Sequence, residues 1–306
     1  MSLSVLNNIN ASYAESNLNK TSSSLSTVLQ QLSSGSKINS GADDAAGLSL
    51  VNGLQANQDA LSQSTTNATE GVGVLQVADG ALSQVTSLLN RAVTLATEVS
   101  NGTLNTTQDA AANEEYKSIL SEVSNIGSTT TYNQQQVFGN SFAIYTGDST
   151  TQGASVDVLT ISSLNATDTT GTVGDAGGTI TYTAGSATTA ASITYTADAA
   201  GGTSLAGTDL TTQTDAQTAL TSLNTAIADV SSQDGYIGAQ INTLNAISTV
   251  ESSQQENIQS AQNAVQATDY ATASSNLSKY EILSQTGIAA LSQANSVQQE
   301  VTKLLQ

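Results

Sequence analysis

Residues 11–32 read ASYAESNLNKTSSSLSTVLQQL, and small or apolar side chains recur in this stretch at alternating steps of three and four. The recurring positions are Ala11, Ala14, Leu18, Thr21, Leu25, Val28 and Leu32. Such an a/d seam is typical of a coiled-coil helix. We expect this helix to end at Ser33-Ser34-Gly35, because glycine suits the left-handed cap that follows a helix.

The opposite end of the chain carries a second seam with the same spacing. Its positions are Leu283, Gly287, Ala290, Ala294, Val297, Val301 and Leu304. Two such seams at the extremes of one chain predict a coiled-coil pair, and ordinary amphipathic helices on a globular core are the alternative. Short helices of this kind are marginal in water. We therefore expect them to be loosely ordered in the monomer and to become ordered against neighbouring copies.

Helix punctuation predicts three further helices between the seams. Ser40 followed by Asp43 has the spacing of a capping box, which places Asp43 and Asp44 in the first turn of a helix that runs to a glycine cap at Gly102.

A shorter helix is predicted over about residues 107–126, ending at Gly127, and a long helix over about residues 214–267.

Residues 128–208 are rich in Thr, Gly and Ala and change to an alternating pattern. Phe142–Tyr145 and Val156–Ile161 are predicted to be strands. Ile180–Ala184 recurs as Ile193–Ala197, and the two copies are predicted to pair as a hairpin. A β module this small needs support from the helices or from neighbouring copies.

The expected fold is therefore mainly α with a small β region: long antiparallel helices, terminal coiled-coil helices and a short β-rich insertion in the middle of the chain. The predicted segments are a terminal helix at 1–40, the first half of a long-helix domain at 41–140, a β-rich insertion at 141–208, the second half of the long-helix domain at 209–270 and a terminal helix at 271–306.

Charge is distributed unevenly along the 306 residues. The chain has 6 Lys and Arg against 25 Asp and Glu, for a formal net charge of −19. Residues 41–270 hold 22 of the acidic residues against only Arg91 and Lys117, so both ends are nearly neutral. Because like charge keeps surfaces apart, the ends are the parts able to self-associate. The alternative is that the whole chain is acidic for solubility.

Composition excludes several classes of function. The chain contains no His and no Cys, so it lacks the usual ligands of zinc, haem and iron–sulfur sites and cannot form a disulfide or a Ser-His-Asp triad. The chain has only six Lys and Arg residues, which argues against binding to nucleic acid or an anionic membrane surface, because both need clustered basic residues. Acidic residues that are adjacent in the sequence do not face each other on a helix, so they do not form a pair of carboxylates for acid–base catalysis. We expect no enzyme activity, no cofactor and no metal.

The two ends together resemble the bacterial flagellin family. The segment that carries the resemblance most clearly is LSSGSKINSGADDAAGL at residues 32–48. The other end agrees at Asp269–Thr272, Asn276–Ser278, Gln293–Asn295 and Leu304–Leu305. The match covers roughly residues 1–140 and 210–306 and leaves 141–208 unmatched.

This resemblance implies a structural subunit that assembles into the helical flagellar filament for swimming motility. It implies terminal helices in the filament core, with Leu18, Leu25, Val28, Leu32, Leu283, Ala290, Ala294, Val297, Val301 and Leu304 as the polymerisation core. It also implies a secreted, extracellular protein exported by the flagellar type III system without a cleaved signal peptide. The implied partners are other copies, an export chaperone, the filament cap and hook-junction proteins.

The resemblance also implies a candidate surface for an innate immune receptor, formed by Arg91, Leu95 and Glu115. The alternative for Arg91 is a cation that ties together an acidic subunit. Gln31, Ala42 and Asn52 replace residues that are often basic in the family, so we expect cohesion between copies to depend little on ion pairs. Two other functions remain open: a hook–filament junction protein and a coiled-coil adhesin-like stalk.

Overall fold

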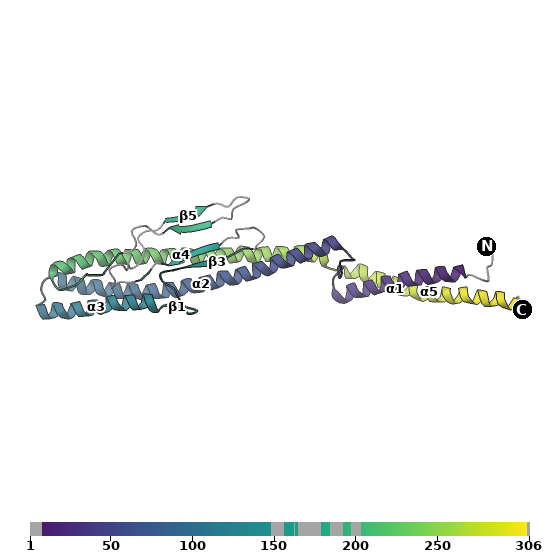
Figure 1. Ribbon diagram of the computed structural model, residues 1–306, viewed down its shortest axis with the longest axis horizontal. Helices are drawn as coiled ribbons and strands as arrows, with labels where there is room; N and C mark the ends of the chain where they lie inside the picture. The colour runs from purple at the N-terminus through teal and green to yellow at the C-terminus, as the bar shows by residue number, and fades with distance from the viewer. Residues whose placement is uncertain are drawn as a thin grey trace. The chain divides into compact units, whose positions relative to one another are not determined.

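The computed structural model describes residues 8–147, 156–161, 163–164, 179–183, 192–196 and 203–304 (Figure 1). The described residues form the helices α1 (Ile9–Ser34), α2 (Ala45–Ser100), α3 (Thr106–Thr129), α4 (Gln213–Gln266) and α5 (Tyr270–Leu304). They also form the strands β1 (Thr131–Tyr132), β2 (Gln135–Gln136), β3 (Asn140–Tyr145), β4 (Val156–Ile161), β5 (Thr179–Thr183) and β6 (Ser192–Thr196). This confirms the predicted fold, which is mainly α with a small β region.

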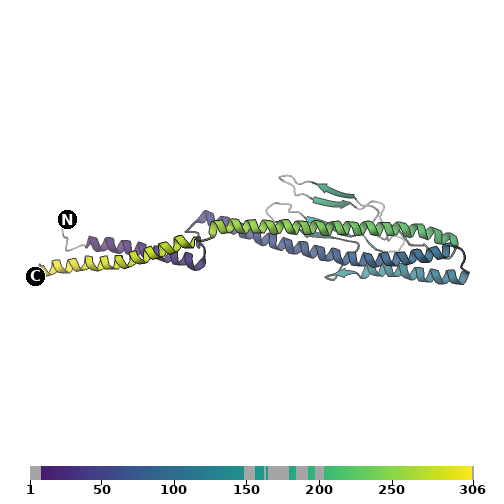
Figure 2. The ribbon, with the colours of Figure 1, turned by 180° about the vertical axis from the view of Figure 1, so that it is seen from behind.

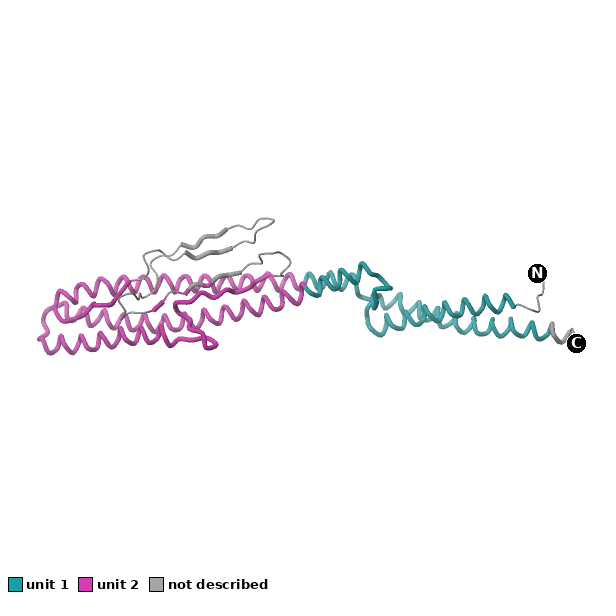
Figure 3. Tube along the Cα trace, viewed as in Figure 1, with its two compact units in different colours: residues 1–56, 257–306 teal, residues 57–256 magenta. Residues whose placement is uncertain are grey.

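The chain divides into two compact units (Figure 3). Unit 1 comprises residues 1–56 and 257–306, and unit 2 comprises residues 57–256. Both terminal helices, α1 and α5, fall in unit 1, while α2 and α4 contribute to both units.

Unit 2 is built on α2 and α4, which lie side by side (Figures 1 and 2). Its buried residues follow heptad spacing on both helices. The buried residues at these spacings on α2 are Leu61, Ser64, Ala68, Gly71, Leu75, Ala78, Leu82, Val85, Leu89, Ala92, Ala96 and Val99, and those on α4 are Ala216, Ala219, Leu223, Ala226, Val230, Gln233, Ile237, Gln240, Leu244 and Glu251. Val74, Leu95, Asp229 and Tyr236 are also buried, beside the seams. A seam of this kind on each helix packs them as an antiparallel coiled coil.

Two contacts define the register of the α2/α4 pair. Ser64 hydrogen-bonds to Glu251, and a Cβ added at Gly71 would lie 3.1 Å from Leu244 Cδ1. Moving seven residues along α2 therefore corresponds to moving seven residues back along α4. This register places Gln240 opposite Leu75 and Gln233 opposite Leu82.

The third helix of unit 2, α3, contributes Tyr116, Ile119, Leu120 and Val123 to the buried core. The prediction that this helix ends at Gly127 is wrong, because α3 continues to Thr129. A Cβ added at Gly127 would lie 2.1 Å from the carbonyl oxygen of Leu164. The glycine therefore permits a close backbone approach and does not cap the helix.

The described strands form three two-stranded antiparallel sheets, β1–β2, β3–β4 and β5–β6. β3 and β4 contain both predicted strands. Ile180 of β5 lies opposite Tyr195 of β6, which confirms that the two copies of the internal repeat pair as a hairpin. The final alanine of each copy lies outside the described residues.

By length and composition, α2 contains an 18-residue window apolar enough to cross a membrane. Core helices of water-soluble proteins pass the same test, and α2 supplies much of the hydrophobic core of unit 2.

Candidate self-association surface

The loop after α1 and the loop before α5 are joined by a short antiparallel bridge. α1 ends at Gly35, which has a φ of 72° and donates its N–H to Gln31 O. Lys37 N donates to Gln266 O at 2.8 Å, and Thr268 N donates to Gly35 O at 3.0 Å. Segments more than 200 residues apart in the sequence are thus held together at one end of the α1/α5 pair.

The start of α2 differs from the prediction. The helix begins at Ala45, so Asp43 and Asp44 precede its first turn and the predicted capping box is wrong. Asp43 Oδ2 accepts hydrogen bonds from the N–H groups of Asn39 (3.1 Å) and Ser40 (2.8 Å), which lower the pKa of the Asp43 carboxyl. Asp44 Oδ1 accepts from Gly47 N at 2.9 Å and supplies the cap instead.

Asp269 caps the start of α5. Its Oδ2 accepts from the Thr272 hydroxyl at 2.7 Å, and its Oδ1 accepts from the N–H groups of Ala271 and Thr272 at 3.0 and 3.3 Å. These bonds, first the one from the hydroxyl, lower the pKa of the Asp269 carboxyl. The segment at residues 32–48 therefore ends α1 and begins α2, and the segment at residues 269–272 begins α5 after the end of α4.

α1 and α5 lie side by side and antiparallel (Figures 1 and 2). Asn8 Nδ2 donates to Ala294 O at 3.0 Å, and a Cβ added at Gly287 would lie 3.2 Å from Leu18 Cδ1. All seven predicted seam positions of α1 are buried or half-buried, whereas most other residues of this helix are exposed. The seam of the first helix is therefore confirmed.

The face that α5 turns toward α1 is displaced from the predicted seam. The buried or half-buried positions with heptad spacing are Ala273, Leu277, Tyr280, Ser284, Gly287, Leu291, Ala294 and Gln298. Only Gly287 and Ala294 were predicted, while Leu283, Ala290 and Val297 are exposed. Gly287 and Ala294 belong to both rows, so the row that faces α1 is identified by the partial burial of Ser284 and Leu291 and not by the contact at Gly287. The side chains of Val301 and Leu304 lie outside the described residues.

Unit 1 exposes most of the large hydrophobic side chains on the described surface. Nine of the eleven belong to it: Ile9, Tyr13, Leu29, Leu50, Tyr270, Ile282, Leu283, Ile288 and Val297. Only four of its hydrophobic side chains are among those described as buried: Val28, Ile38, Val51 and Ala273. Unit 1 is also nearly neutral, with four basic and six acidic residues, against two and 19 in unit 2. This concentration of exposed apolar side chains makes unit 1 the candidate self-association surface.

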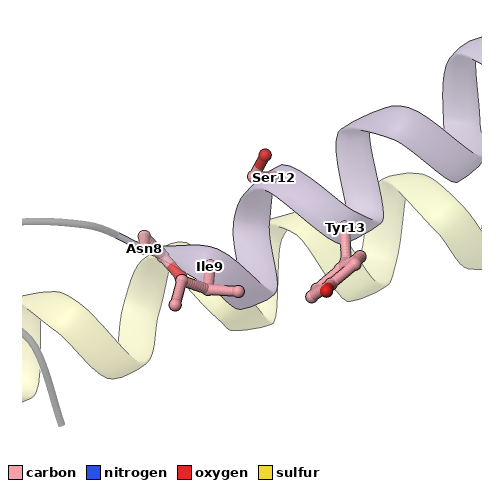
Figure 4. A pocket seen from close by; sticks show the side chains of 4 residues that line it. All are labelled: Asn8, Ile9, Ser12 and Tyr13. Atoms are coloured by element: carbon pink, nitrogen blue, oxygen red, sulfur yellow. The ribbon is translucent and has the colours of Figure 1, made fainter.

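An open depression of about 500 Å³ lies at the first two turns of α1 and is lined by Asn8, Ile9, Ser12 and Tyr13. In the view of Figure 4 the Ser12 side chain is directed upward and the Tyr13 ring downward. Ile9 and Tyr13 are 60% and 68% exposed. Sequence reasoning missed this surface because both residues lie off the seam, although their spacing of four places them on one side of a helix.

Arg91 and Glu115 join α2 to α3 within unit 2. Arg91 Nη2 lies 2.7 Å from Glu115 Oε1, and both side chains are about half exposed. It is the one ion pair found among the described residues. Leu95 is only 3% exposed, so it cannot belong to the predicted receptor surface in this structure. The geometry agrees with the alternative for Arg91, a cation that holds acidic helices together.

The described part of the chain brings together no group of three or more acidic side chains that could hold a metal ion.

Comparisons with known proteins match both ends of the chain. The family model described as the bacterial flagellin N-terminal helical region matches residues 5–143, and the model of the C-terminal helical region matches residues 220–305. Flagellin from Halalkalibacterium halodurans is 31% identical over 278 residues, which cover 90% of each chain. Flagellin from Listeria monocytogenes serovar 1/2a is 29% identical over 293 residues, or 94% of each chain.

Polar flagellin C from Vibrio parahaemolyticus is 38% identical over 142 residues, which cover 46% of this chain and 37% of that one. Among solved structures, Bacillus cereus flagellin gives a TM-score of 0.44 at 22% identity, covering 60% of this chain and 88% of that one.

The two family models together span well over half of the chain, and the relatives named above are flagellins. A junction protein or an adhesin-like stalk is therefore not favoured. The chain belongs to the bacterial flagellin family: it is a structural subunit that self-assembles into the extracellular flagellar filament, and it is not an enzyme.

Proposed function

We propose that unit 1 carries the polymerisation core of this flagellin and that its exposed apolar side chains become buried between copies. The observation that supports this is the concentration of nine of the eleven exposed large hydrophobic side chains in the smaller and less charged unit. Burying a leucine or valine side chain gives roughly 1.5–3 kcal/mol. Several such side chains in each copy would supply a strong drive for assembly.

The residues of the proposed core have two roles. Leu18, Leu25, Val28 and Leu32 hold α1 against α5 within one chain. Leu283, Ala290 and Val297 form the exposed row on α5, with Gly287 and Ala294 at its border. We assign this exposed row to contacts with a neighbouring copy, and we place Val301 and Leu304 at its end by their spacing in the sequence.

A pair of matched substitutions tests this assignment. Val297→Asp places a charge on the exposed row, and Val250→Asp places the same charge on an exposed valine of unit 2. Because both valines are exposed, both variants should keep the circular dichroism of the wild-type monomer. We expect short filament seeds to elongate with the Val250→Asp subunit and not with the Val297→Asp subunit, as measured by electron microscopy.

Equal elongation by the two variants would contradict the proposal. Leu25→Asp tests, in the same assay, the α1 residues that hold α1 against α5. It should stop elongation by separating α1 from α5 while unit 2 stays folded.

We further propose that the chain leaves the cell through the flagellar type III channel and meets an export chaperone, the filament cap and hook-junction proteins. Membership of the flagellin family supports this route, as does the sparse burial within the α1/α5 pair. A strain with a disabled type III channel should retain the subunit in its cells. Secretion of the subunit by such a strain would refute this route.

Recognition by an innate immune receptor is a further proposal, and it now rests on Arg91 and Glu115. Their half-exposed, paired side chains present both charges on one surface of α2 and α3. Binding of monomer to the receptor ectodomain should weaken in Arg91→Ala, with Lys117→Ala as a control on α3. Unchanged binding by Arg91→Ala would remove this surface from consideration.

A further inference from the structure

A buried carboxylate lies between α2 and α4 near the end of β3. Glu251 is 4% exposed and Ser64 is 1% exposed. The Ser64 hydroxyl donates a hydrogen bond to Glu251 Oε1. The Thr65 hydroxyl lies 3.3 Å from Oε2 and 3.0 Å from the Leu61 carbonyl oxygen, so its one proton is shared between these two acceptors. The ion pair found among the described residues involves neither Ser64 nor Glu251, so the Ser64 hydroxyl is the main hydrogen-bond donor to Glu251 and no cation accompanies it.

Ser64 also bonds to the backbone two residues past the end of β3. Its hydroxyl oxygen accepts the backbone N–H of Gly147 at 2.7 Å. A serine hydroxyl has one proton and two lone pairs. Because its proton is directed at Glu251, a lone pair is free to accept from Gly147. The three groups form one chain of hydrogen bonds from Gly147, just past β3, through Ser64 of α2 to Glu251 of α4.

Two further contacts hold the same end of β3 on the helices. Asn67 Nδ2 donates to Tyr145 O at 3.0 Å. A Cβ added at Gly71 would lie 3.1 Å from Ile144 Cγ1, which indicates that this side chain rests directly on α2. Ser64, Asn67 and Gly71 lie at steps of three and four, so they present one continuous surface to the strand.

The cost of burying Glu251 indicates a specific role. A buried carboxylate loses several kcal/mol of hydration, and an apolar residue at a seam position avoids that loss. Gln233 and Gln240 lie on the same α4 seam, but both side-chain amide atoms of Gln233 and the Oε1 of Gln240 have no hydrogen-bond partner. What distinguishes Glu251 from these two glutamines is its link through Ser64 to β3.

We infer that Glu251 is a positioning residue that orients the Ser64 hydroxyl to hold the N–H of Gly147, and thereby sets where the outer strand β3 ends on the helices. The inference goes beyond filament assembly. It assigns the placement of an outer strand to a residue on α4 that lies more than 100 positions away in the sequence. The effect passes through one hydroxyl group, so it requires Ser64.

Amide exchange of Gly147 in the full-length monomer tests the inference. Ser64→Ala removes the acceptor, and we expect it to speed exchange at Gly147 by about tenfold or more. Glu251→Leu frees the hydroxyl to rotate and should give a smaller but clear increase. Glu251→Gln keeps an acceptor for Ser64 and should restore nearly wild-type exchange. Gln240→Leu removes another buried polar group of the same seam and should leave Gly147 unchanged.

A double substitution separates positioning from general destabilisation. If Glu251 acts through Ser64, then Glu251→Leu should add nothing to the exchange rate of Gly147 in the Ser64→Ala background. Additive effects would overturn the inference, as would an increase with Gln240→Leu equal to that with Glu251→Leu. If Glu251→Leu fails to fold, Glu251→Gln and Ser64→Ala still decide. Wild-type exchange in Ser64→Ala would refute the hydrogen bond on which the inference rests.

Discussion

At the scale of single residues, two helical glycines of unit 2 have opposite structural roles. A Cβ added at Gly127 of α3 would collide with the Leu164 carbonyl oxygen, 2.1 Å away, whereas a Cβ added at Gly80 of α2 would meet nothing within 4 Å. Both glycines carry the same entropic cost within a helix. Only at Gly127 is this cost offset, because the missing side chain lets the Leu164 backbone pack closely against α3.

Alanine substitutions should therefore change stability in opposite directions. We expect Gly127→Ala to lower the free energy of unfolding by about 1–3 kcal/mol, because backbone must move to admit the methyl group. Gly80→Ala should raise it by about 0.5–1 kcal/mol through its better helix propensity. Urea unfolding followed by circular dichroism measures both. Equal signs for the two variants would contradict the packing described at Gly127.

Asp234 on α4 makes the stability of unit 2 depend on pH. Burial, then the hydrogen bond and the like charge of Asp79, raise the pKa of Asp234 to about 6 from an ordinary 3.8. Folding therefore favours the protonated carboxyl. Its contribution to stability is present below about pH 4 and is lost as the pH rises through about 6.

Asp234→Asn should accordingly stabilise unit 2 at pH 8 and have little effect at pH 4. Solvent screens this largely exposed group, so we expect a gain of about 1 kcal/mol, well below the full value of the shift. Thermal unfolding as a function of pH measures it. Glu256→Gln removes one charge from the same helix and controls for general repulsion. A gain independent of pH would argue against the Asp79–Asp234 pair.

At the scale of elements, the two helix pairs differ in how much they bury. α2 and α4 share a long seam of fully buried side chains, many of them 0% or 1% exposed. Most seam positions of α1 and α5 are only half-buried, and Val28 and Ala273 are the buried hydrophobic exceptions in the described parts of these helices. A helix pair with so little buried surface gains less from tertiary packing, which is what stabilises most helices in proteins.

Amide exchange should therefore separate the pairs. In monomer we expect residues 9–30 of α1 to exchange roughly 100-fold faster than residues 75–96 of α2, because local opening costs less where fewer contacts are lost. In assembled filaments the difference should shrink. Strong protection of α1 in the monomer would show that the pair is already stable without neighbouring copies.

At the scale of the whole molecule, charge and exposed apolar surface are divided between the units. Unit 2 holds 19 acidic residues and two basic residues, while unit 1 is nearly balanced and exposes most of the large hydrophobic side chains. Repulsion between acidic surfaces opposes close contact of copies and weakens with salt. Salt does not weaken apolar contacts between copies as it weakens this repulsion.

Filaments should for this reason tolerate salt. We expect them to dissociate at the same or a higher temperature in about 0.5 M NaCl than in about 0.05 M NaCl, because salt screens repulsion and few ion pairs are available to be lost. Light scattering during a temperature ramp measures this. Dissociation on raising the salt concentration would mean that ion pairs between copies dominate cohesion.

Much of the fold was predictable because its signals are local. Glycine caps placed the C-terminal ends of α1 and α2 within a residue or two, the period of apolar residues placed both ends of α4 within one residue, and alternation identified β3 and β4. The start of α2 was predicted too early. Local signals failed where a residue serves a distant partner. Gly127 resembles a helix end but accommodates Leu164, and Asp43 resembles part of a cap but binds the preceding turn.

The candidate site shows the same division. The sequence by itself determined that both ends carry apolar seams with little net charge, because periodicity and charge are properties of the chain alone. Only the tertiary structure decided which row of α5 faces α1, that Leu95 is buried and that Glu251 reaches β3 through Ser64. The physical reason is that an apolar row in the sequence indicates which side chains must be buried, but it does not indicate which other segment they pack against. The partner is settled by contacts between residues far apart in the sequence, such as the hydrogen bond from Ser64 to Glu251, which no local pattern encodes.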